Sequence, residues 1–161
     1  YYDVIKQKTA ALFEACAGIG ALSSGASEED VEAAKLFGQN LGITFQIRDD
    51  IFDYYDSSEI GKPTGNDMAE GKLTLPALFA LNHSEDAEIH ACAQRIKSGE
   101  ATPAEIARLV EYTKAHGGIE YAEQRMLELR DEALSLLPQW KSPAVREALE
   151  GYIHFVVERK W

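Results

Sequence analysis

The stretch FQIRDDIFD at residues 45–53 places three carboxylates inside an apolar helical pattern. At 100° per residue, five polar side chains fall within about a third of the helix circumference: Gln46, Asp49, Asp50, Asp53 and Asp56. Like charges on one helical face repel one another and require a counterion. Oxygen ligands without His or Cys suit Mg²⁺, which keeps several waters and binds through one or two carboxylates together with substrate phosphates. The spacing therefore predicts a magnesium site.

Two lysines follow the acidic stretch at short range. Lys62 lies in the sequence GKPTGND at residues 61–67, and Lys72 lies in EGKLTLP at residues 70–76. Glycines let the backbone turn tightly near a ligand, and lysines act as mobile point charges for phosphate groups. Lys8 and Thr9 in the first helical pattern would add a third cation and a hydroxyl. This set predicts a diphosphate clamp that favours departure of diphosphate from carbon.

Length and composition define the class of protein that can carry such a site. The chain has 161 residues, of which 45% are apolar and 27% charged, and this predicts one globular domain over residues 1–161 without an internal boundary. No apolar run reaches the length of a membrane span and the first residues do not resemble a signal peptide, so we expect a cytoplasmic protein. The net charge of −11 argues against nucleic acid and anionic membranes as partners.

The elements that must position these residues are helices. Apolar residues recur at helical spacing over residues 4–22, 28–55, 73–81, 87–97, 103–115, 119–137 and 144–159. Ser27 is predicted to cap the second helix, and Pro76 to lie in the first turn of the third. Residues 57–69 are rich in Gly, Ser, Pro and Asn and predict a loop. The pattern indicates an all-α fold, a helical bundle with the acidic stretch facing a central cavity.

Four motifs together resemble those of the trans-polyprenyl (isoprenyl) diphosphate synthases: KTA at residues 8–10, Gly42 with FQxxDDxxD at 45–53, GKPxGxD at 61–67 and EGKxTLP at 70–76. GGIE at residues 117–120 matches a late turn of the same family more weakly. The chain is similar to the C-terminal half of these enzymes, nearest to the octaprenyl and solanesyl type. The resemblance implies a helical bundle of the isoprenoid synthase type, present here as part of a domain.

The resemblance also implies an activity, which is Mg²⁺-dependent condensation of isopentenyl diphosphate with an allylic diphosphate to a linear trans-polyprenyl diphosphate. It implies metal ligands at Asp49, Asp50 and Asp53. It implies contacts to the allylic diphosphate from Lys8, Lys62 and Lys72, with support from Thr9 and Gln46. The residues implied in catalysis are Asp49, Asp50, Lys8 and Lys62. A homodimer is the implied assembly of the full-length protein.

Alternatives remain open at this point. The family has two aspartate-rich motifs, and the one at residues 49–53 resembles the second of them. No other Asp-Asp-x-x-Asp occurs in these 161 residues, so we expect a part of a larger enzyme. A non-catalytic helical subunit or scaffold would also keep the motif, and a terpene cyclase would share the architecture. Lys62 and Lys72 favour the synthase, because a cyclase has no second diphosphate substrate to hold. Lys8 would equally suit a solvated helix face.

Overall fold

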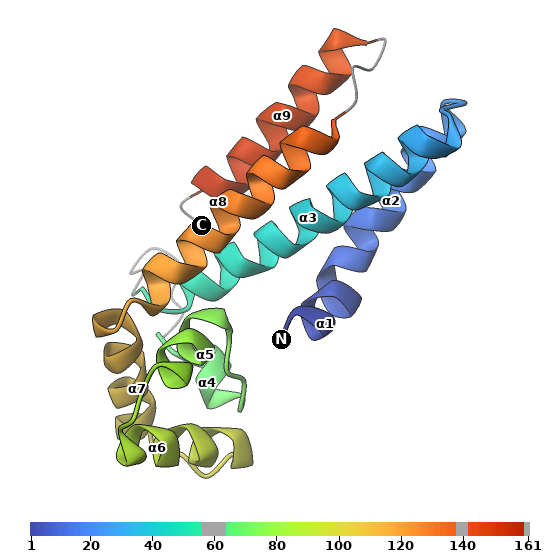
Figure 1. Cartoon of the computed structure of the whole chain (residues 1–161). Helices are drawn as coiled ribbons and strands as arrows, with labels where there is room; N and C mark the ends of the chain where they lie inside the picture. Colours follow the sequence, from blue (N-terminus) through green and yellow to red (C-terminus); the bar gives the residue numbers. More distant parts are fainter. Residues whose placement is uncertain (56–63, 138–141, 160–161) are drawn as a thin grey trace. The chain divides into compact units, whose positions relative to one another are not determined.

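The computed structural model describes residues 1–55, 64–137 and 142–159, and every element in these ranges is helical (Figure 1). The all-α class predicted from the sequence is confirmed. The elements are α1 (Tyr2–Ile5), the π-helix η1 (Lys6–Ala10), α2 (Ala11–Ser23), α3 (Glu28–Phe52), α4 (Asn66–Ala69), α5 (Leu75–Asn82), α6 (Ala87–Ser98), α7 (Pro103–Ala115), α8 (Gly118–Leu136) and α9 (Pro143–Glu158). Within the described ranges, no helix has the length and apolar character needed to cross a membrane.

The chain forms two compact units, which are described separately. The first contains residues 1–48 and 125–159, and the second contains residues 49–124. Helices α3 and α8 each contribute residues to both units. The single domain expected over residues 1–161 stays a prediction.

The core of the first unit lies among α3, α8 and α9. Phe37 and Leu41 are one turn apart on α3, and Ile153 and Val156 share a face of α9. Ala133 and Leu137 complete this buried cluster, and Phe13 and Phe45 pack against it. Burial of a large apolar side chain contributes roughly 1.5–3 kcal/mol. The apolar stripes of these amphipathic helices therefore provide the core of the unit.

Two glycines let α3 approach the N-terminal segment closely. A Cβ atom at Gly38 would lie 2.5 Å from the carbonyl oxygen of Phe13, and one at Gly42 would lie 2.6 Å from Cα of Ala10. Both distances are shorter than any real carbon contact, so only glycine fits. Positions 38, 42 and 46 are one turn apart on α3, and the same face therefore continues at Gln46.

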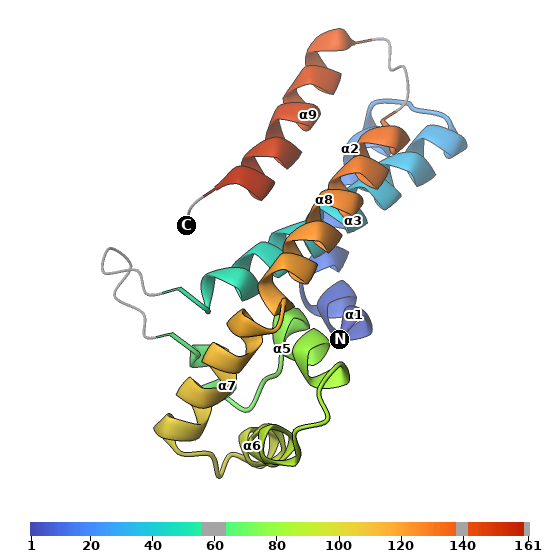
Figure 2. The same ribbon diagram turned by 60° about the vertical axis from the view of Figure 1, so that its left-hand side comes forward.

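The second unit contains the short helices α4 to α7 (Figure 2). Helix α7 packs against α4, α5 and α6, and α4 also contacts α6. A capping box starts α7, because the Thr102 hydroxyl accepts from the Glu105 N–H and the Glu105 carboxylate accepts from the Thr102 N–H. Asp86 caps α6 in a similar way by accepting from the N–H groups of Glu88 and Ile89.

Two of the sequence motifs meet inside this unit. A Cβ atom at Gly118, in the GGIE turn, would lie 2.5 Å from the carbonyl oxygen of Pro76, in EGKLTLP. Gly117 has φ +74°, a left-handed conformation that favours glycine. The paired glycines thus allow α8 to start directly against the first turn of α5.

The predicted helices agree with the structure to within a few residues. Ser27 caps α3, since its hydroxyl accepts from the Asp30 N–H at 3.2 Å, and Pro76 lies in the first turn of α5. The predicted loop over residues 57–69 was wrong in part, because residues 66–69 form α4. Residues 6–10 form a π-helix within the helical segment predicted over residues 4–22, a detail that the pattern did not indicate. Both depend on contacts or backbone geometry that residue composition does not encode.

Candidate functional site

The acidic stretch lies at the C-terminal end of α3. Asp49 and Asp50 are in its last turn, and Asp53 follows directly after its final residue, Phe52. Asp50 is buried, with 2% of its surface exposed, whereas Asp49 and Asp53 are partly exposed. The C-terminal end of a helix carries partial negative charge, so carboxylates gathered there favour a cation. Asp56, the last residue of the predicted arc, lies outside the described residues.

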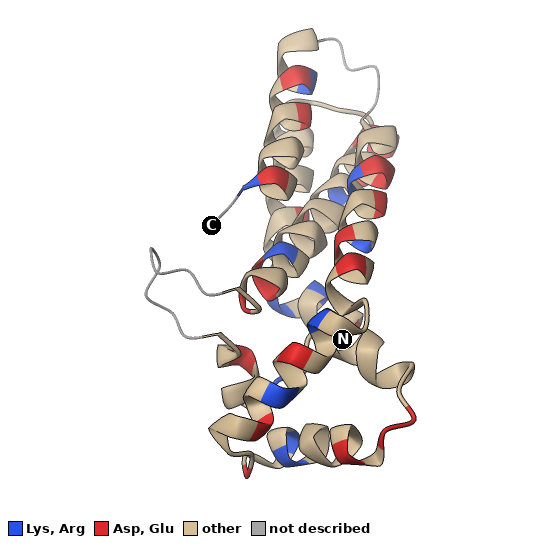
Figure 3. Ribbon diagram, turned by 90° about the vertical axis from the view of Figure 1, so that its left-hand side faces the viewer, with Lys and Arg blue, Asp and Glu red and all other residues tan. Residues whose placement is uncertain are grey.

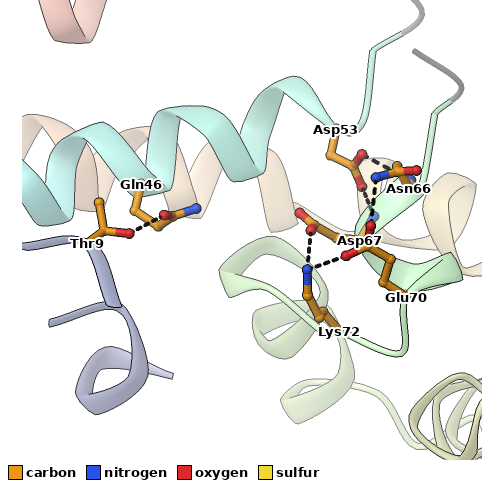
Figure 4. A network of polar contacts seen from close by, with 7 residues as sticks. All are labelled: Thr9, Gln46, Asp53, Asn66, Asp67, Glu70 and Lys72. Atoms are coloured by element: carbon orange, nitrogen blue, oxygen red, sulfur yellow. Dashed lines mark hydrogen bonds and ion pairs between the residues drawn. The ribbon is translucent and has the colours of Figure 1, made fainter. Parts of the chain in front are cut away.

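Asp53 forms hydrogen bonds with the backbone of residues 65–67, which include the start of α4. Its Oδ1 accepts a hydrogen bond from the N–H of Asn66 at 3.0 Å, and its Oδ2 accepts one from the N–H of Asp67 at 3.1 Å (Figure 4). Its carbonyl oxygen accepts from the N–H of Gly65 at 2.8 Å. The Asp53 carboxylate therefore caps the first turn of α4.

Lys72 is held at the other end of α4. Its backbone N–H donates to the carbonyl oxygen of Asp67 at 2.8 Å. Its Nζ lies 3.7 Å from Oδ1 of Asp67 and forms a close ion pair with Glu70 (Figure 4). The hydrogen bond that Lys72 donates to the Glu70 carboxylate, aided by the charges of Glu70 and Asp67, holds the pKa of Lys72 above its usual value. The side chain is exposed and carries a full positive charge.

In the first unit, the structure brings together the two residues predicted to support the substrate. The Thr9 hydroxyl donates to Oε1 of Gln46 at 2.7 Å, and both side chains are partly buried (Figure 4). Thr9 and the exposed Lys8 lie within η1. Short π-helical segments are rare and occur frequently at functional sites. The close approach at Gly42 sets the separation that this hydrogen bond spans.

Arg48, the residue before the acidic pair, anchors the end of α9. Its guanidinium donates twice to the carbonyl oxygen of Arg159, at 2.9 and 2.6 Å. The Arg159 guanidinium lies 4.1 Å from the centre of the Phe45 ring and donates to the Phe45 carbonyl oxygen at 3.3 Å. Cation–π contacts of this kind contribute roughly 0.5–2 kcal/mol. The acidic helix and α9 are thus fixed together within the first unit.

Tyr54 is a residue that the sequence reasoning missed. It follows Asp53, and 2% of its surface is exposed. Burial raises its pKa well above the usual value, hydrogen bonding to Thr74 acts in the opposite direction, and the charge of Asp53 raises the pKa further. The phenol therefore stays neutral and connects the acidic stretch to the EGKLTLP segment. An aromatic residue with a hydroxyl directly after three carboxylates was the available signal.

The predicted site residues are divided between the two units. The first unit contains Lys8, Thr9 and Gln46, and the second contains Asp49, Asp50, Asp53 and Lys72. Lys62 lies outside the described residues. The assignment of these residues to catalysis, substrate and metal stays a prediction, as does the central cavity.

The donor set fits Mg²⁺ on chemical grounds. Among the described residues, no group of three or more His, Cys, Asp or Glu side chains is arranged to hold a metal ion. Mg²⁺ does not need such a cage, because it commonly uses one or two carboxylates and completes its shell with water and substrate phosphates. Asp49 and Asp50 at the end of α3 are carboxylates of the type that such a partial site uses.

The helical fold and the motifs at the end of α3 define a class of protein. Residues 1–113 match the model of the polyprenyl synthetase family, and the chain belongs to this family. It is 35% identical over 160 residues to octaprenyl diphosphate synthase from Escherichia coli, covering 99% of the chain and 49% of that protein. It is 36% identical over 154 residues to the chloroplastic solanesyl diphosphate synthase 2 of Arabidopsis thaliana, covering 94% of the chain and 36% of that protein. The resemblance inferred from the motifs is confirmed.

Solved structures agree with this assignment. A geranylgeranyl pyrophosphate synthase from Bacteroides thetaiotaomicron is 53% identical with a TM-score of 0.93, over 99% of the chain and 52% of that structure. A polyprenyl synthase from Caulobacter crescentus, complexed with calcium and isoprenyl diphosphate, is 35% identical with a TM-score of 0.88, over 100% of the chain and 49% of that structure. The isoprenoid synthase type of fold is therefore confirmed. The chain spans about half the length of the curated relatives it matches.

Proposed function

We propose that this chain is the allylic-diphosphate half of a Mg²⁺-dependent trans-prenyltransferase. The enzyme would condense isopentenyl diphosphate with an allylic diphosphate to a linear trans-polyprenyl diphosphate. The observation that carries the proposal is the acidic end of α3, linked through Asp53 and α4 to the exposed Lys72. Family membership and the isoprenyl diphosphate of the Caulobacter crescentus structure support it.

The proposed roles follow from charge and position. Asp49 and Asp50 are the principal metal ligands, and Asp53 contributes directly or through water. Lys8, Lys62 and Lys72 hold the diphosphate, while the hydrogen-bonded pair of Thr9 and Gln46 supports it. We assign the catalytic roles to Asp49, Asp50, Lys8 and Lys62. Neutralisation of the charge on the departing diphosphate is the chemistry that Mg²⁺ supplies when bound.

Several wider expectations belong to this proposal. A parent enzyme with a further aspartate-rich motif, a homodimer, a cytoplasmic location and an absence of nucleic-acid partners are all proposed on the resemblance and the composition. The net charge of −11 supports the last of these, because binding to nucleic acid requires clustered cations.

Titration calorimetry of farnesyl diphosphate with and without Mg²⁺ tests the proposal. Asp49→Asn and Asp50→Asn should each weaken Mg²⁺-dependent binding at least about tenfold, which corresponds to about 1.4 kcal/mol. Glu29→Gln is the matched control, because it makes the same charge change at an exposed position in the first turn of α3. Its affinity should equal that of the wild type.

Two outcomes would count against the assignment. Farnesyl diphosphate affinity that is unchanged by Mg²⁺ and by the Asp49 and Asp50 substitutions would refute the proposed metal site. Mg²⁺-dependent binding without condensation, in a protein that also carries the further aspartate-rich motif, would favour the non-catalytic subunit instead.

A further inference from the structure

We propose that Asp53 is a positioning residue whose carboxylate holds the first turn of α4 and, through α4, places Lys72. The contact between Asp53 and α4 is independent of the proposed function. The role of Lys72 in binding a diphosphate rests on the proposed function.

The first step is the bond set of Asp53 itself. Its two carboxylate oxygens accept from consecutive backbone N–H groups, and its carbonyl oxygen accepts from the N–H before them. Hydrogen bonds to an ionised acceptor are about twice as strong as neutral ones. Two bonds of this kind and the bond to the carbonyl oxygen join residue 53 to residues 65–67.

The second step leads from α4 to Lys72. Asp67 donates its N–H to Asp53, and its carbonyl oxygen accepts the N–H of Lys72. The Asp67 carboxylate also lies 3.7 Å from the Lys72 ammonium. One residue therefore connects the carboxylate of Asp53 with both the backbone and the side chain of Lys72 (Figure 4).

The third step is that α4 cannot hold this geometry alone. It contains 4 residues, and an isolated helix of that length is unstable in water. The buried Met68 packs it into the second unit. Gly65 and Gly71 flank it with φ of +78° and +80°, and a Cβ at Gly65 would lie 2.9 Å from Cγ2 of Ile106. Packing thus retains α4, and Asp53 orders its N-terminal end.

Hydrogen exchange of the metal-free protein, measured without any ligand, tests whether Asp53 stabilises the first turn of α4. In the presence of EDTA, Asp53→Asn should accelerate exchange of the Asn66 and Asp67 amides at least about tenfold, because the substitution removes the negative charge and replaces one of the two acceptor oxygens with an NH₂ group that only donates. Exchange of the Lys72 amide should accelerate as well. Asp49→Asn makes the same chemical change in the same motif and should leave all three rates unchanged.

Unchanged protection of Asn66 and Asp67 in a folded Asp53→Asn protein would overturn the proposal. Accelerated exchange at Asn66 and Asp67 with an unchanged Lys72 amide would overturn the part that concerns Lys72. If Asp53→Asn unfolds the protein, Asp53→Glu replaces it, because the longer side chain keeps the charge and displaces both acceptor atoms.

A double-mutant cycle on farnesyl diphosphate affinity tests whether Asp53 affects diphosphate binding through Lys72. Asp53→Asn should weaken binding less in the Lys72→Met background than in the wild type, because both substitutions act on the same cation. Fully additive losses would separate Asp53 from Lys72. Absence of any allylic diphosphate binding by the wild type would refute the proposed function and leave the exchange result to decide the role of Asp53.

Discussion

Asp49 and Asp53 are the same residue type four positions apart, but they lie in different surroundings. Asp49 lies within the last turn of α3, whereas Asp53 lies after the helix end and turns to backbone donors at residues 66 and 67. The sequence motif predicts three equivalent carboxylates. It could not distinguish them, because the partners of Asp53 are backbone N–H groups that every residue except proline provides.

Tyr54 gives a test by pH at the scale of one residue. Burial raises its folded-state pKa above the usual tyrosine value of 10.0, so folding favours the neutral phenol. The resulting stability is fully present below pH 10.0 and declines as the pH rises toward the folded-state pKa. Between those values, the wild type should lose about 1.4 kcal/mol of unfolding free energy per pH unit relative to Tyr54→Phe.

Urea denaturation of both proteins at pH 8, 10 and 11 measures this difference. Tyr152→Phe is the control, because it removes the hydroxyl of an exposed tyrosine on α9. Parallel pH dependence of the wild type and Tyr54→Phe would show that the Tyr54 phenol ionises as readily in the folded protein as in the unfolded chain.

At the scale of elements, local signals predicted most helices and missed those that depend on distant contacts. Periodicity and caps placed α7 at its observed bounds, Pro103–Ala115. Helix α4 was missed because a loop composition surrounds it and its N-terminal cap comes from Asp53. The π-helix was missed because one shifted hydrogen-bond register leaves no mark on apolar spacing.

The packing of α3 against the N-terminal segment predicts opposite effects for two glycine substitutions. Gly42→Ala would place a methyl group 2.6 Å from Cα of Ala10 and should lower the unfolding free energy by roughly 1–3 kcal/mol. Gly20→Ala, in α2, meets nothing within 4 Å and should raise it by up to about 1 kcal/mol. Urea denaturation measures both. Equal effects of the two substitutions would refute close packing at Gly42.

At the scale of the whole molecule, the negative net charge of the chain opposes binding of the proposed anionic ligand. The chain has 27 acidic and 16 basic residues, and acidic positions occur along helices of both units (Figure 3). An anionic diphosphate must therefore approach against a negative field and depend on a cation and a few lysines. The Debye length falls from about 30 Å at 0.01 M salt to about 10 Å at 0.1 M, so salt weakens long-range repulsion more than contact pairs.

The association rate constant of farnesyl diphosphate should accordingly rise with ionic strength over this range at a fixed concentration of free Mg²⁺. Stopped-flow measurement with a fluorescent allylic diphosphate analogue gives this rate. A fall in the rate would mean that the lysines, rather than the net charge, govern the approach of the ligand.

The class of the whole molecule followed from the sequence, whereas its division into units did not. Helical patterning and four short motifs were sufficient for the all-α fold and the polyprenyl synthetase family. The passage from the first unit to the second falls between Arg48 and Asp49, inside the continuous helix α3. Helical periodicity runs unbroken through this point, so no local pattern could mark it.

The bonds of Asp53 to backbone donors also have an evolutionary consequence. Because Asn66 and Asp67 contribute only their N–H groups to these bonds, their side chains can change between relatives without disturbing the cap. Position 53 should then show no correlated substitution with positions 66 and 67, apart from exclusion of proline at both. Contact inference from correlated substitutions would therefore overlook the contact between residue 53 and residues 66 and 67.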